Sequence, residues 1–354
     1  MTYRDNSFDL VRLLGALMVL WGHSFVLAGS TYVPAFFSSS VHTVGVKMFF
    51  VISGYLISQS WLRDPNIIRY FQRRCLRIFP ALIFCVVLTV FVFGPIFSSR
   101  SVSAYFSDPA TFGYLKNSAL YISYYLPGLF EGNPSSAING SLWTLPVEMA
   151  AYIACPIVLF IRKQLVLKVA ICLVLALSIY VDRIALSLPA EDHVVFYATN
   201  LVYANSLLVY FWIGCFIALF RLDRFLNLQV ALLLVIVFLS VPNFYGVKPY
   251  LPYLVISYLT LALGTTKLAP GFSWVRRGDI SYGLYLWAYP VQQVVIFNKL
   301  GSGTPLSVFL WATAITAVFA TVSWVYIEKP ALKFKPRSRT TPEVADAVTE
   351  TLPS

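Results

Sequence analysis

The chain has 354 residues, of which 58% are hydrophobic and 12% charged, and its formal net charge at pH 7 is +11. An ordinary soluble domain is about 45–50% apolar and about 25% charged, so this composition is that of a membrane protein. It argues against a soluble enzyme, a secreted disulfide-rich domain and a disordered scaffold.

Ten stretches are apolar and about long enough to cross a bilayer, which takes about 20 residues of helix. Their apolar runs are continuous rather than alternating, which favours helices over a β-barrel. The first run is too long for a cleaved signal peptide, so we expect it to be retained. We predict an all-α integral membrane protein with about ten transmembrane helices near residues 8–28, 42–62, 79–98, 143–161, 165–183, 199–220, 226–242, 249–266, 279–299 and 305–327.

The distribution of basic residues predicts the orientation of these spans. With the N-terminus in the cytoplasm, twenty of the basic residues fall in or beside cytoplasmic segments. The outside segments then hold only five, which are Arg100, Lys116, Arg183, Lys248 and Lys299. Cytoplasmic loops of membrane proteins are enriched in Lys and Arg. The sequence therefore predicts that the N- and C-termini are both cytoplasmic.

Residues 1–336 are predicted to form one membrane domain, without an internal repeat or a second soluble domain. The longest connection, about 99–142, is expected outside the membrane, with short helical pieces near 114–126. Loops of this length are usually functional, for example as a lid or a platform for sugar rings. The polar segment 337–354 has no apolar periodicity and is predicted to be a disordered cytoplasmic tail. The five cysteines form no Cys-x-x-Cys pair, so we expect buried free thiols and no metal site.

Ionisable side chains inside a bilayer are costly and are functional candidates by default. His23, Lys47 and Glu148 each lie five residues from the outer end of a predicted span. At about 1.5 Å per residue, all three are roughly 7–8 Å below the outer boundary. This shared depth predicts a buried, water-accessible site in which Glu148 orients His23 as a general base. The alternatives are that His23 only hydrogen-bonds between helices, and that Lys47 snorkels or neutralises Glu148 rather than reacting.

A second group of candidates lies toward the cytoplasm. Arg12 precedes His23 by eleven positions, which is roughly 16 Å along a helix. Arg73, Arg74 and Arg77 come just before the third predicted span and are close enough in a helix to share one face. Guanidinium groups bind phosphates with two hydrogen bonds. The spacing equally fits a lipid-headgroup anchor that also sets topology.

The ordered set of these segments resembles the acyltransferase-3 family of integral membrane O-acyltransferases. The similarity covers about residues 8–330, and two positions depart from many relatives: Lys47, where an acid is common, and Ala288, where histidine is common. The similar segments are Arg12 with His23 eleven positions later, the aromatic-rich block Gly45–Ile57, Arg74-x-x-Arg77, Asn139–Glu148, the Ser281–Leu286 segment with Pro290, and Tyr326–Pro330.

The resemblance implies an enzyme that moves an acyl group, most often acetyl, from cytoplasmic acyl-CoA to a sugar hydroxyl of a surface or exported glycan or its lipid-linked precursor. No permanently bound cofactor, metal or nucleic acid is implied, and the expected location is a bacterial inner membrane. His23 would be catalytic, with Glu148 in the acceptor-side site, and Arg12, Arg73, Arg74 and Arg77 would bind the donor. Candidates for the acceptor site or for oxyanion stabilisation are Lys47, Ser53, Asn139, Trp143, Tyr282 and Tyr285.

Two other classes of function remain open from the residues alone. A secondary transporter or glycan flippase would also place charges inside many spans, although paired interrupted helices in two matching halves are not evident. A membrane sensor or scaffold would use the same polar groups only for packing. Loss of a CoA thioester, dependent on His23, distinguishes acyl transfer from both.

Overall fold

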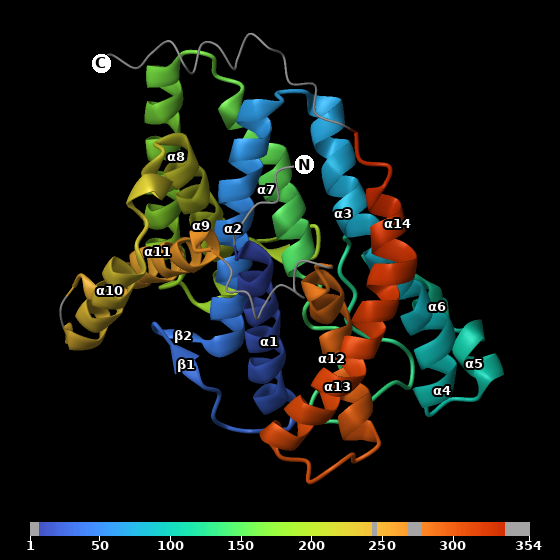
Figure 1. Ribbon diagram of the computed structural model, residues 1–354. Coiled ribbons are helices and arrows are strands. Elements are labelled where there is room, and N and C mark those ends of the chain that lie inside the picture. The colour runs from blue at the N-terminus through green and yellow to red at the C-terminus, as the bar shows by residue number, and fades with distance from the viewer. Residues whose placement is uncertain (1–6, 243–245, 268–277, 337–354) are drawn as a thin grey trace.

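The computed structural model describes residues 7–242, 246–267 and 278–336, and these residues are mainly helical (Figure 1). Each of the ten predicted ranges contains a helix. The long elements are α1 (Phe8–Leu27), α2 (Val41–Arg63), α3 (Ile67–Leu88), α7 (Thr144–Leu159), α8 (Gln164–Ala185), α9 (Leu201–Leu219), α10 (Leu228–Ser240), α11 (Leu251–Thr265), α12 (Ser281–Phe297) and α13 (Pro305–Ser323).

Within the described residues, six helical runs are both long enough and apolar enough to span a membrane, which supports an integral membrane protein. The remaining helices in the predicted ranges are shorter. One of them is α10, whose predicted range, 226–242, is also the shortest of the ten. The six runs are Phe8–Leu27, Val41–Arg63, Ile67–Phe97, Gln164–Ala185, Leu201–Leu219 and Pro305–Leu332.

The third helix differs most from its predicted range. It begins at Ile67 rather than near residue 79, because the Asn66 side chain accepts a hydrogen bond from the backbone N–H of Arg69 and caps it. The helix continues through a π-helical turn, η1 (Thr89–Phe93), into α4 (Gly94–Phe97). The basic cluster therefore belongs to the membrane helix itself and not to a loop before it.

The short elements complete the chain. The connection near 99–142 holds three short helices, of which η2 falls in the predicted 114–126 region, while residues beyond Ala119 are irregular. The predicted tail, 337–354, lies outside the described residues. The short elements are β1 (Ala35–Phe36), β2 (Ser39–Ser40), α5 (Val102–Ser107), α6 (Pro109–Gly113), η2 (Tyr114–Ala119), η3 (Ala190–Asp192), β3 (Val195–Phe196), β4 (Thr199–Asn200), η4 (Leu222–Phe225), η5 (Lys248–Tyr250), η7 (Trp324–Glu328) and α14 (Lys329–Leu332).

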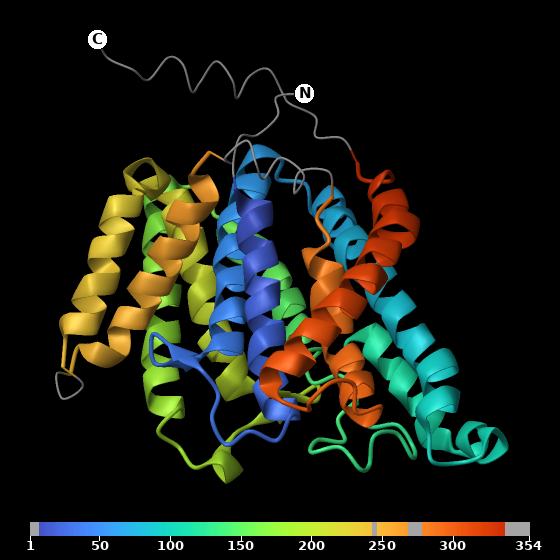
Figure 2. The ribbon, with the colours of Figure 1, turned by 60° about the horizontal axis from the view of Figure 1, so that its bottom comes forward.

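The bundle has two distinct ends (Figure 2). The start of α1, the α2–α3 connection and the end of α14 lie at one end, which we call the arginine end. The opposite end, which we call the hairpin end, is formed by segments that follow helices running in the other direction. These segments are the α1–α2 connection with β1 and β2, the α8–α9 connection with β3 and β4, and the segment 98–143.

The centre of the bundle is formed by α2, which lies between α1 and α9. In the apolar window of α2, 67% of the residues are buried inside the protein, against 11% in α8 at the periphery. Most residues of α2 and α12, including their glycines, are buried and face other parts of the protein rather than lipid. The thiols are free, and Cys85, Cys155 and Cys215 are buried; the prediction of burial is wrong for Cys172, which is exposed on α8.

Candidate active site

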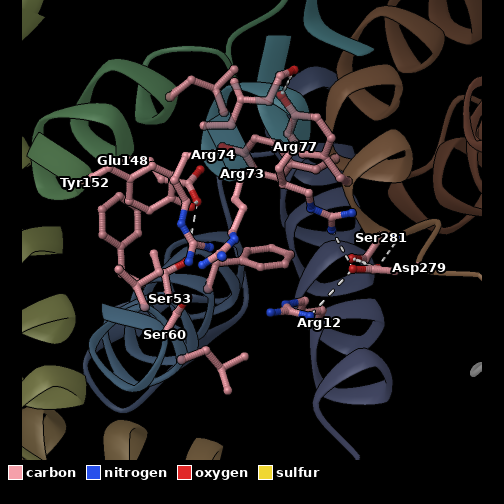
Figure 3. A pocket seen from close by; sticks show the side chains of 18 of the residues that line it. Arg12, Ser53, Ser60, Arg73, Arg74, Arg77, Glu148, Tyr152, Asp279 and Ser281 are labelled. Atoms are coloured by element: carbon pink, nitrogen blue, oxygen red, sulfur yellow. Dashed lines mark hydrogen bonds and ion pairs between the residues drawn. The ribbon is translucent and has the colours of Figure 1, made fainter. Parts of the chain in front are cut away.

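A cavity of about 490 Å³ opens among α1, α2, α3, α7 and α12 toward the arginine end (Figure 3). Its lining is strongly basic, with two acidic residues, Glu148 and Asp279. The predicted donor-side arginines, which come from two helices, all line it. The basic lining residues are Arg12, Arg63, Arg73, Arg74, Arg77 and Lys335.

Asp279, just before α12, holds two of these arginines in place. Its carboxylate lies 2.5 Å from Arg77 and 3.6 Å from Arg12, and Ser281 donates a hydrogen bond to it. Burial by itself would raise the pKa of Asp279, but the two guanidinium groups and the Ser281 contacts hold it at about 2. The carboxylate is therefore ionised at neutral pH and fixes the spacing of the two arginines (Figure 3).

Asp64 plays the corresponding part for the start of α3. It forms ion pairs with Arg69 and Arg73. The hydrogen bond from Arg69 and the charge of Arg73 lower the pKa of this carboxyl, against the effect of burial. Because Asp64 already neutralises much of the charge of Arg73, that arginine keeps less attraction for a ligand.

Arg74 has no ion pair among the described residues, unlike Arg12, Arg73 and Arg77. Its Nε is buried and has no hydrogen-bond partner. The guanidinium is held instead over two aromatic rings, 5.4 Å from the centroid of Tyr70 and 5.6 Å from that of Tyr152. Since a buried donor without a partner is costly, this group is suited to an anionic ligand.

Glu148 also lines this cavity. It accepts hydrogen bonds from the Tyr152 hydroxyl and, at 3.4 Å, from Ser53 Oγ. Among the described residues no hydrogen bond joins Glu148 to His23 or to Lys47. Lys47 instead donates to Ser39 Oγ at 2.7 Å and lies 5.0 Å from the centroid of the Tyr210 ring, which fits snorkelling toward the hairpin end rather than neutralising Glu148.

His23 lies outside the cavity lining, in a group of three rings. Its imidazole stacks on that of His42, with centroids 4.8 Å apart and planes at 21°, and meets the edge of Tyr289 at 5.2 Å. The Nδ1 atoms of both histidines are buried and have no hydrogen-bond partner among the described residues. The expected His23–Glu148 pair is not formed, because equal depth does not fix which way a helix faces.

One face of α12 connects the cavity to His23. Tyr282 and Tyr285 line the cavity, and Tyr289, one turn beyond Tyr285, contacts His23. The Tyr285 hydroxyl lies 2.5 Å from Thr144 Oγ1 and donates to the Ser141 carbonyl at 2.8 Å. These tyrosines come at positions i, i+3 and i+7, which is the spacing of one helix face.

The other predicted residues divide between the cavity and the scaffold. Ser53, Tyr282 and Tyr285 line the cavity, whereas Lys47, Asn139 and Trp143 do not. Asn139 is buried and bridges the α7 entry to α12 by donating to the Leu286 carbonyl at 2.9 Å. In the described part of the chain no group of side chains is arranged to hold a metal ion.

Sequence reasoning missed several residues of this region. The sequence analysis assigns no role to His42, although its position at the outer start of the second predicted span is a signal for a neighbour of His23. Asp279 is likewise assigned no role, because it lies at the cytoplasmic end of a predicted span. Tyr152, Tyr289 and Lys335 gave no signal, since tyrosine and terminal lysine are common at membrane interfaces.

The fold and the cavity define an integral membrane protein with a basic internal site near a stacked pair of histidines. Residues 5–328 match the family model described as an acyltransferase domain, Acyl_transf_3. The chain therefore belongs to the acyltransferase-3 family of membrane acyltransferases. This confirms the resemblance seen in the motifs and supports acyl transfer as the class of activity.

Individual relatives agree with this assignment. The chain is 32% identical over 333 residues to the O-acetyl transferase of Shigella phage Sf6, which covers 92% of this chain and 96% of that protein. It is 28% identical to nodulation protein 10 of Rhizobium leguminosarum bv. viciae, covering 93% and 94%. It is 24% identical to O-acetyltransferase OatA of Staphylococcus aureus, covering 82% of this chain but 52% of that protein. No solved structure matches the chain.

Proposed function

We propose that this protein is a membrane O-acetyltransferase that moves an acetyl group from cytoplasmic acetyl-CoA to a sugar hydroxyl of a surface or exported glycan. The observation that carries the proposal is the basic cavity in which Arg74 lacks an ion pair, joined through Tyr285 and Tyr289 to His23. The names of two relatives, both O-acetyl transferases, support acetyl as the group.

The donor would enter from the arginine end. The phosphates of acyl-CoA match the charge of the cavity, and Arg74 is suited to bind one of them with two hydrogen bonds. The long thioester arm would then extend between α2 and α12, past Tyr282 and Tyr285, toward His23. Arg12 and Arg77, held by Asp279, would keep the mouth of the cavity positive.

Transfer at His23 needs only acid–base chemistry. A ring nitrogen of His23 takes the proton of the sugar hydroxyl as the hydroxyl oxygen attacks the thioester carbonyl. The tetrahedral intermediate collapses, the carbon–sulfur bond breaks, and the thiolate takes the proton from the imidazolium, giving the sugar ester and free CoA. The other route transfers the acyl group first to His23 and then to the hydroxyl, and both routes have the same overall balance.

We further infer ten spans with both termini in the cytoplasm of a bacterial cell, in the inner membrane. The separation of the basic cavity at one end from the hairpins at the other supports this orientation. It places the donor cavity toward the cytoplasm and His23 toward the outside, where a sugar acceptor would arrive.

The proposal is tested with purified protein in nanodiscs, acetyl-CoA and a mixture of bacterial glycans. We expect release of free CoA together with an ester mass increment on a glycan, and loss of both by at least about a hundredfold in His23→Ala. His193→Ala, which changes a histidine far along the chain in the α8–α9 connection, serves as the matched control. Equal thioester consumption by wild type and His23→Ala, or none by either across the glycans tested, would overturn the proposal.

A further inference from the structure

The structure contains an internal repeat that the sequence does not reveal. The hairpin before α2 and the hairpin before α9 match at a constant separation of 160 residues. Phe37 and Ser38 have φ of 50° and 58°, and their counterparts Tyr197 and Ala198 have φ of 49° and 54°. In both hairpins the first helical N–H bonds back across the strands, from Val41 to Pro34 and from Leu201 to Val194.

The two repeated units meet in a reciprocal way. A Cβ on Gly54 would lie 1.9 Å from the carbonyl oxygen of Phe211, and a Cβ on Gly214 would lie 2.3 Å from that of Val51. Gly54 and Gly214 are again 160 residues apart, and so are Val51 and Phe211. A contact in which i meets j while j meets i is the mark of a two-fold axis, so α2 and α9 cross about a local two-fold.

This axis relates the donor cavity to a second cavity. On α2, Ser53, Leu56 and Ile57 line the donor cavity. Their counterparts Ile213, Phe216 and Ile217 on α9 line a cavity of about 440 Å³ between α8, α9 and α11. Residues at equivalent positions thus face one cavity in each unit.

The chemistry of the two cavities is opposite. The donor cavity is lined by arginines, whereas the second cavity is lined by aliphatic, Phe and Tyr side chains and by no charged residue. It lies beside α8, the helix with most of its surface outside the bundle. An apolar cavity at the membrane-facing side of a bundle is suited to a hydrocarbon chain.

The second cavity continues toward the hairpin end as a neighbouring hollow of about 490 Å³ along α8, with Ile179 and Tyr250 lining both. This hollow is lined by Arg183 and Ser187. The Arg183 guanidinium lies 5.6 Å from the centroid of Tyr250 and has no ion pair among the described residues. A cation near a helix end, next to an apolar groove, fits the phosphate of a lipid headgroup.

We propose that this groove binds the lipid carrier of the acceptor glycan, with its hydrocarbon chain between α8, α9 and α11 and its phosphate beside Arg183. The inference rests on the proposed function and names the form of its acceptor as a lipid-phosphate-linked glycan. Arg183 occupies the position in the second unit that His23 occupies in the first, since they are 160 residues apart. The headgroup would therefore lie at the same membrane level as the catalytic histidine.

The experiment compares two acceptors with the same glycan, one linked to a polyprenyl diphosphate and one free in water. Arg183→Gln and the cavity-filling variant Leu175→Trp are each expected to raise the KM for the lipid-linked acceptor about tenfold, with kcat, the donor KM and the free-glycan KM unchanged. Arg183→Lys is expected to restore part of the affinity. Leu173→Trp, on the same helix at a side chain that is 65% exposed, is the matched control for Leu175→Trp.

Binding of polyprenyl phosphate is measured separately by native mass spectrometry, so that the result does not depend on turnover. The proteins compared are the wild type, Arg183→Gln and Leu175→Trp. Wild type is expected to retain the lipid and both variants to lose it. Equal retention by all three, or an equal change in KM for both acceptors, would overturn the lipid site. If wild type binds the lipid but transfers no acyl group to either acceptor, the proposed function fails, and the lipid then has no role as acceptor carrier.

Discussion

At the scale of single residues, the stacked pair of imidazoles is the feature with the most direct consequence for catalysis. His42 lies flat on His23, and its Nε2 lies 3.0 Å from Ser40 Oγ. His42→Phe keeps the stack but removes the ring nitrogens, so we expect kcat to fall about tenfold, in line with the loss of about one hydrogen bond, and the donor KM to stay constant. Steady-state kinetics measure both values.

His193→Phe is the control for this change, because it makes the same substitution at an edge-on ring contact with Tyr203. The thermal unfolding temperature should be the same in both variants. An unchanged kcat in His42→Phe would show that the second imidazole only fills space.

The partners of each arginine predict different effects on donor binding. Arg74 lacks an ion pair, whereas Arg69 is bound to Asp64 and does not line the cavity. We expect Arg74→Gln to raise the KM for acetyl-CoA about tenfold or more, because a charge-assisted hydrogen bond is worth about 1.5–3 kcal/mol. Arg69→Gln should leave this KM within about twofold. Isothermal titration with CoA would check the order, which is contradicted if Arg69→Gln has the larger effect.

Lys335 predicts a pH dependence of donor binding. Partial desolvation of its ammonium group and the positive charges of Arg77 and Arg74 lower the pKa of Lys335 to about 8, while the side chain itself is exposed. The lysine is therefore charged below pH 8 and neutral above it, so the cavity loses one positive charge as the pH rises. We expect the KM for acetyl-CoA to increase between about pH 7 and pH 9 in wild type and to change less in Lys335→Arg. The same slope in both proteins would contradict this assignment.

At the scale of elements, α2 and α9 approach so closely that only glycine fits at their crossing. Gly54→Ala would place a methyl group 1.9 Å from the Phe211 carbonyl oxygen, so the two helices must separate. We expect a loss of about 1–3 kcal/mol in stability, seen as a lower unfolding temperature in detergent. Gly113→Ala is the control, because a Cβ there meets nothing within 4 Å. Equal unfolding temperatures for the two variants would contradict a tight crossing.

The element boundaries show what local sequence can and cannot predict. The apolar run predicted the third helix only from about residue 79, because the basic residues before it lower its hydrophobicity. The Asn66 cap and the apolar residues between the arginines extend that helix to Ile67. Helix length depends here on capping and on burial of Tyr70 against α7, which is a tertiary contact.

At the scale of the whole molecule, the charge distribution predicts the side on which each end lies. A reporter enzyme that is active only in the cytoplasm, fused after residue 336, should be active. The same reporter inserted at Gly132, in the segment 98–143, should be inactive, and a reporter that is active only outside should show the reverse. Activity of the same reporter at both positions would refute the odd number of spans that the proposed orientation places between them.

The class of protein, the ten helical ranges and the arginines of the basic cavity could be predicted from the sequence, because apolar run length and charge are local properties. The sequence also singled out His23. The partners of these side chains depend on the tertiary fold: Glu148 lines the cavity with the arginines and is not paired with His23, His42 stacks on His23, and Asp279 spaces Arg12 and Arg77. The reason is that sequence gives the depth of a side chain, while the direction in which it faces depends on how helices distant in sequence cross. The repeat about α2 and α9 also escapes sequence analysis, because its two units share backbone geometry but have hardly any side chains in common.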